Sequence, residues 1–179
     1  MKKVIWALIV VIIGATTISI INNREHNKDF LDAELMTIQN YFGQREGNNP
    51  QVSEANVAWH LDHSLKTINR ICEALIASNP EDYHSKFNIQ RIVVHTTGRI
   101  PRGAAQSPQS VRPPDVILLD SLRWQLEAAR TNLDKISALE EHAFFAHPVF
   151  DQLDRDQTRR FLDIHTNHHL KIIEDILDE

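Results

Sequence analysis

Four segments of the chain carry apolar residues at helical spacing, and this repeated pattern restricts the fold more than any other feature. In each segment the apolar side chains fall on a single face of a helix. Such faces are stable only when they are buried against one another, so the pattern predicts an all-α protein built as a four-helix bundle. The expected helices comprise residues 29–45, 53–78, 115–138 and 154–177.

The segments between these helices are short or rich in breakers. Residues 99–114 hold four of the seven prolines and are expected to form a loop. A short helical piece is expected at residues 83–97, and residues 144–150 are predicted to form a compact apolar linker. A chain of 179 residues suffices for one domain with a real core but not for two, so residues 28–179 are assigned to a single domain.

Net charge and cysteine content exclude some classes of function. The formal net charge is −5, with acidic and basic residues well mixed, which disfavours a basic face that binds nucleic acid. The single cysteine, Cys72, cannot form an internal disulfide. It lies on the apolar stripe of its helix, where a small buried hydrophobe is a simpler interpretation than a catalytic thiol.

The N-terminus begins with Lys2 and Lys3, followed by eighteen uncharged residues from Val4 to Ile21. This length meets the lower bound for a bilayer-spanning helix, so residues 1–23 are predicted to be a single-pass membrane anchor. The two lysines then place the remaining chain outside the cytoplasm. The alternative is a signal sequence, in which case the mature domain is secreted or periplasmic, although no clear A-x-A cleavage site follows the run.

The last predicted helix carries two histidines, His165 and His169, one turn apart on the same side as Leu162 and Ile173. Burying two imidazoles costs free energy unless each nitrogen finds a partner, and a metal ion satisfies both at once. The alternative is a pair of hydrogen-bonded core histidines. Thr166 stands where a zincin motif requires glutamate, which argues against a metalloprotease.

Two more histidines, His60 and His63, lie near the start of the second helix. By helical projection they sit roughly 70° and roughly 130° from the centre of its apolar stripe, so His60 is nominated as the third ligand. His63 stays a second candidate in the same turn. Three imidazoles would leave open positions on a divalent ion, which is typical of a catalytic site. Zinc suits these ligands best, with nickel as the alternative.

The role of such an ion would be to activate a bound water or thiol, producing a nucleophile at neutral pH. Proton carriers or supporting groups could come from other histidines, because imidazole titrates near neutrality. The candidates are His63, His147 and His168.

Four stretches give the chain a family resemblance: AWHLDHSL at 58–65, IPRG at 100–103, FFAHPVF at 144–150 and HTNHHLKII at 165–173. Together with the histidine spacing, they resemble the DinB/YfiT-like superfamily of bacterial metalloenzymes, and within it a subfamily of unknown function. The resemblance covers residues 29–179. It implies an up-up-down-down four-helix bundle in which His60, His165 and His169 hold zinc or nickel. The N-terminal apolar segment departs from this pattern.

The resemblance also implies chemistry. Relatives in that superfamily include transferases and isomerases in which the metal activates a low-molecular-weight thiol such as bacillithiol, mycothiol or glutathione. The sequence therefore predicts a membrane-anchored, metal-dependent transferase or hydrolase that acts on a small molecule. The alternative is a non-catalytic helical binding or stress-response module whose histidines are structural. A homodimer is compatible with both.

Overall fold

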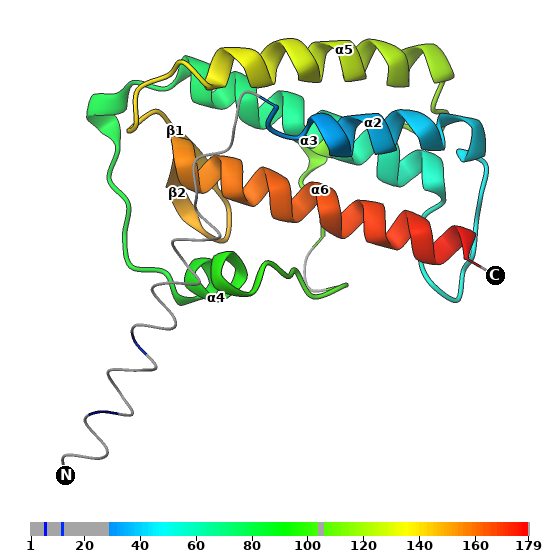
Figure 1. Ribbon diagram of the computed structural model, residues 1–179, viewed down its shortest axis with the longest axis horizontal. Coiled ribbons are helices and arrows are strands. Elements are labelled where there is room, and N and C mark those ends of the chain that lie inside the picture. The colour runs from blue at the N-terminus through cyan, green and yellow to red at the C-terminus, as the bar shows by residue number, and fades with distance from the viewer. Residues whose placement is uncertain (1–5, 7–11, 13–28, 104–105, 179) are drawn as a thin grey trace.

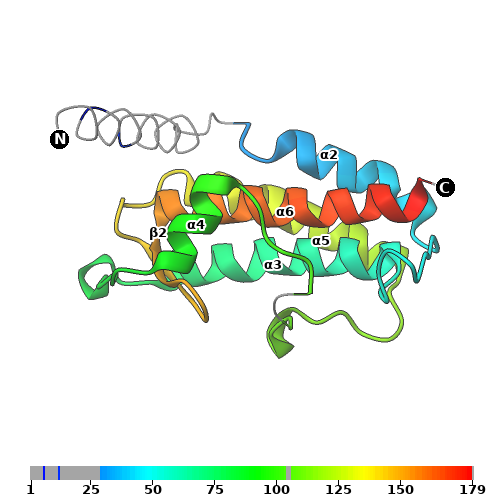
Figure 2. The same cartoon turned by 90° about the horizontal axis from the view of Figure 1, so that it is seen from below.

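The computed structural model describes Trp6, Ile12 and residues 29–103 and 106–178. Four helices lie side by side around one apolar core (Figure 1). They are α2 (Asp32–Asn40), α3 (Val57–Ala77), α5 (Leu119–Ile136) and α6 (Arg155–Leu177), all close to the segments predicted from periodicity. The short helix α4 (Ile89–Thr97) packs outside this group and crosses α6 at a steep angle (Figure 2). The residues that the structure describes also include three 3-10 turns: η1 (Tyr41–Gln44), η2 (Pro80–Asp82) and η3 (Gln109–Val111).

The helix directions differ from the predicted up-up-down-down order. Figure 1 shows α2 and α6 running one way and α3 and α5 the other. Hydrogen bonds between α3 and α5 agree: Gln125 Nε2 donates to Asp62 Oδ2 (2.7 Å), and Asn132 Nδ2 donates to Asn69 Oδ1 (2.9 Å). The partners advance together along both helices, so these helices are parallel. The long connection from residue 78 to residue 118 makes this order attainable, because it returns the chain to the end of the bundle where α3 began.

The all-α prediction is also wrong, because residues 144–154 form an antiparallel hairpin. Its strands are β1 (Phe144–His147) and β2 (Asp151–Asp154), with Phe145 opposite Leu153. Nδ1 of His147 accepts the backbone N–H groups of Val149 and Phe150, each at 3.1 Å, which closes the turn. The predicted apolar linker is therefore an ordered element, and the described part of the chain is mostly helical with one small sheet.

The prediction of a single-pass membrane protein is contradicted as well. Among the residues that the structure describes, no helix combines the length and the apolar character needed to cross a bilayer. The predicted span, residues 4–21, lies outside the described residues except for Trp6 and Ile12.

Helix α3 is the central element of the fold. It packs against α5 on one side and α6 on another, so its buried surface extends well beyond one apolar stripe. Its N-terminus is capped by Asn56, whose side chain accepts the N–H of Trp59 (2.9 Å). Asp154 caps α6 in the same way through the N–H of Gln157 (2.7 Å). The wide burial of α3 allows polar side chains to enter the interior, which is what positions the site described next.

Candidate metal centre

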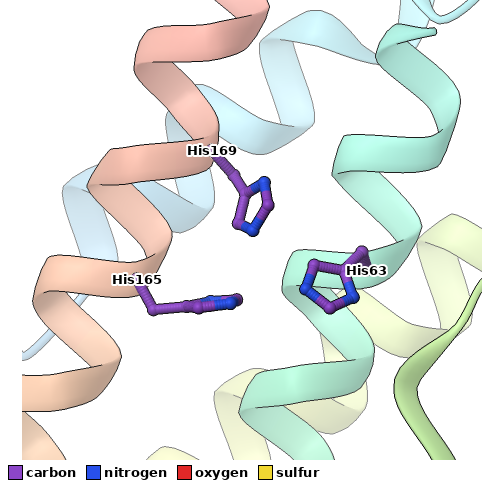
Figure 3. A group of neighbouring side chains, drawn as sticks. All are labelled: His63, His165 and His169. Atoms are coloured by element: carbon purple, nitrogen blue, oxygen red, sulfur yellow. The ribbon is translucent and has the colours of Figure 1, made fainter. Parts of the chain in front are cut away.

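Three histidines from two antiparallel helices converge between α3 and α6. His63 comes from the second turn of α3, and His165 and His169 come from successive turns of α6. Each offers a ring nitrogen, and these nitrogens all lie within 4.8 Å of one another. Figure 3 shows the three rings pointing toward a shared space. The structure thus groups two of the three predicted ligands with His63, the alternative in the same turn as His60.

His63 is held by the loop that covers this end of α3. Its Nδ1 lies 2.9 Å from the carbonyl oxygen of Val111. A carbonyl can only accept, so Nδ1 carries the proton and Nε2 is left with a lone pair. Trp59, one turn earlier, stacks on the His63 ring with centroids 4.8 Å apart and planes 23° apart. This arrangement fixes both the tautomer and the orientation that a metal-binding histidine needs.

His165 contains an unsatisfied buried atom. Its Nδ1 is buried and has no hydrogen-bond partner among the described residues, although the side chain as a whole is partly exposed. The ring lies against Phe161, with centroids 5.5 Å apart, and edge-on to His169 at 4.6 Å. A buried imidazole nitrogen without a partner costs free energy comparable to a lost hydrogen bond.

His60 lies behind His169 rather than within the group of three. Its Nδ1 is 3.0 Å from Nδ1 of His169, and its Nε2 is 3.1 Å from Oγ of Ser53. The projection placed His63 farther from the buried stripe than His60, yet the two are equally buried: His63 is 3% exposed, against 4% for His60. Both rings are buried because α3 is covered on two sides and the loop around Val111 closes over His63.

Burial keeps these imidazoles neutral. Desolvation is the main cause that lowers the pKa of His60, to about 4, and it also lowers the pKa of His63. The pKa values of His165 and His169 fall well below the ordinary value, through burial first and then through repulsion between neighbouring histidines. Metal binding to histidine requires the unprotonated ring, so at neutral pH an ion would not have to displace protons.

The other predicted supporting residues have different positions. His168 is partly buried beside His169, with ring centroids 5.1 Å apart, and stays a candidate for a supporting group. His147 instead closes the hairpin turn and stacks on Phe150 at 4.3 Å, so its role is structural. Burial raises the pKa of the Cys72 thiol to about 12, which agrees with a buried hydrophobe and leaves no thiolate for catalysis.

Ser53 was not predicted to be a site residue, because the sequence placed it at the start of the second helix. In the structure Asn56 caps that helix, and the Ser53 hydroxyl contacts His60 instead. No local sequence signal marks this contact, since it depends on how the loop before α3 folds back over the helix.

No protein-family model, curated protein or solved structure matches the chain. The resemblance to the DinB/YfiT-like superfamily therefore stays a prediction.

Proposed function

We propose that the protein binds one divalent transition-metal ion through His63, His165 and His169. The observation that carries this proposal is the convergence of three neutral imidazoles whose ring nitrogens lie within 4.8 Å of one another. Zinc is the first choice because it accepts three histidines readily, and nickel is the alternative.

The geometry supports an ion if the three rings move slightly closer together. Two nitrogens at about 2.05 Å from a tetrahedral zinc ion lie about 3.3 Å apart. The ring nitrogens here lie within 4.8 Å of one another, so side-chain rotations that move these atoms by about an ångström bring them into place. The hydrogen bond from His63 to Val111 and the contact from His169 to His60 already orient two of the rings.

The chemistry we propose is that of an open metal centre. Three protein ligands leave at least one position for water or for a small ligand such as a low-molecular-weight thiol, whose pKa the ion would lower. His165 is partly exposed, so the centre lies near the surface rather than deep in the core. We therefore propose a metal-dependent transferase or hydrolase that acts on a small molecule, in line with the family resemblance.

Metal content tests the binding part of the proposal. Full-length protein purified without an affinity tag is expected to carry about one zinc or nickel ion per chain by elemental analysis. His63→Ala, and the double variant His165→Ala with His169→Ala, should carry almost none, because the first loses one of the three ligands and the second loses two. His84→Ala, in an exposed loop, is the matched control and should keep its metal. Metal-free parent protein that also fails to take up added zinc would overturn the proposal and leave a hydrogen-bonded histidine core.

The open coordination position is tested separately with Co²⁺ as a visible probe. Cobalt-loaded protein is expected to develop an intense near-ultraviolet thiolate-to-metal charge-transfer band when glutathione is added, because the thiolate takes the free position. Cys72 cannot contribute this band, since its thiol is buried and protonated. A d–d spectrum that does not respond to glutathione would rule out the thiol-dependent reaction while leaving metal binding intact.

A further inference from the structure

We infer that Ser53 and His60 form a positioning pair that fixes the tautomer and orientation of His169 for metal binding. This inference rests on the proposed metal site. It makes His60 a hydrogen-bond partner of the ligand His169 rather than a ligand of the ion. It also gives Ser53, in the loop before α3, a role at the site.

His60 and His169 contact each other through two like atoms. Nδ1 of His60 and Nδ1 of His169 are 3.0 Å apart, so one must donate and the other accept. If His169 presents Nε2 to the ion, its proton is on Nδ1, and His169 is the donor. His60 must then accept with Nδ1, and as a neutral ring it carries its own proton on Nε2.

Ser53 satisfies that second proton. Nε2 of His60 lies 3.1 Å from Oγ of Ser53, which can accept from it. The same Oγ accepts the backbone N–H of Ala55 (3.1 Å), which holds the serine side chain in place. The chain of hydrogen bonds therefore runs outward from His169 to His60 and then to Ser53, and every step is consistent with a lone pair on Nε2 of His169.

The same contacts leave His60 with no nitrogen for the ion. Both of its ring nitrogens are engaged, and the side chain is 4% exposed. The tautomer and orientation of His63 are fixed in a different way, by its hydrogen bond to the backbone carbonyl of Val111. Partners of this kind fix the ring that binds a metal, and their loss typically weakens metal affinity by about 10- to 100-fold.

Three variants of the full-length protein test the pair, with the dissociation constant for zinc measured by competition with a chromogenic chelator. His60→Leu removes both contacts and is expected to weaken zinc binding by about 10- to 100-fold. His60→Asn places an acceptor oxygen near the position of Nδ1 and should recover most of that loss. Ser53→Ala should give a smaller loss, since His60 keeps its contact with His169. In all three the stoichiometry and the Co²⁺ spectrum should match the parent, because the three ligands are unchanged.

His95→Asn is the matched control, since His95 is another histidine whose pKa burial lowers to about 4, and it lies at the α4–α6 contact instead of at the site. It should leave zinc affinity unchanged. If His60→Leu fails to fold, as judged by circular dichroism, Ser53→Ala and His60→Asn still decide the question.

The outcomes separate this inference from the proposed function. A parent protein that binds no zinc overturns both. A parent that binds zinc, with affinities unchanged in His60→Leu and Ser53→Ala, overturns only the positioning pair. A changed cobalt spectrum in His60→Leu, together with metal retained in His63→Ala, would show that His60 is itself a ligand. An Asn variant as weak as the Leu variant would also contradict the pair, because it would point to a loss of packing.

Discussion

Adding zinc at about 1,000 times its dissociation constant is expected to raise the melting temperature of the metal-free protein by roughly 10 °C. An ion that binds only the folded state stabilises it by about 4 kcal/mol at that concentration. For a chain of this size, one kcal/mol corresponds to roughly 2–4 °C in melting temperature. The folded state alone joins His63 on α3 to His165 and His169 on α6, so the unfolded chain cannot offer the same site. Thermal melts followed by circular dichroism, in EDTA and then in excess zinc, measure the shift.

Two controls make the shift specific. His63→Ala should melt at the same temperature with and without zinc, whereas His84→Ala, in the exposed loop, should respond like the parent. Mg²⁺ should have no effect, since it prefers oxygen ligands. An equal response of the parent and His63→Ala would mean that zinc acts elsewhere on the chain.

The helices and two of the three histidines of the site follow from sequence periodicity. Apolar spacing located α3, α5 and α6 because each buries a stripe in one core, and the i, i+4 pair on α6 put His165 and His169 on the buried side. Such local patterns predict burial correctly, because they depend only on which side of a helix is covered.

The third member of the site did not follow from the projection, for a physical reason. A single-stripe projection assumes that a helix is covered from one direction, and α3 is covered by both α5 and α6. The loop around Val111 then closes over His63 itself, a contact that a helical projection cannot show.

The hairpin and the helix order were mispredicted because they depend on specific tertiary and turn contacts, which the spacing of apolar residues does not indicate. Four-residue strands are too short to show alternation, and the turn between them relies on the His147 side chain accepting two backbone N–H groups. The parallel pairing of α3 and α5 depends on polar partners such as Asp62 and Gln125, which become recognisable only when both helices are in place.

The metal-free protein is expected to lose stability as the pH falls from about 6.5 to about 4, and two histidines outside the metal centre contribute to this loss. Burial lowers the pKa of both His95 and His147 to about 4, from an ordinary value of 6.5. Between these values the unfolded chain binds more protons than the folded one, so the free energy of unfolding falls with pH. It is fully retained above about 6.5. At 1.36 kcal/mol per pKa unit, each histidine accounts for at most about 3 kcal/mol across the window. Urea unfolding at successive pH values in EDTA measures the slope.

The His147→Asn variant separates this contribution from that of the site. An asparagine oxygen near the position of Nδ1 can still accept the N–H groups of Val149 and Phe150, but it cannot take up a proton in this range. The variant should therefore be close to the parent at pH 7, apart from the lost stacking on Phe150, and should show a shallower decline toward pH 4. His142→Asn, which replaces an exposed ring stacked on Tyr83, should decline like the parent. An unchanged slope in His147→Asn would show that protonation of this ring does not limit stability, and that the turn tolerates a charged histidine.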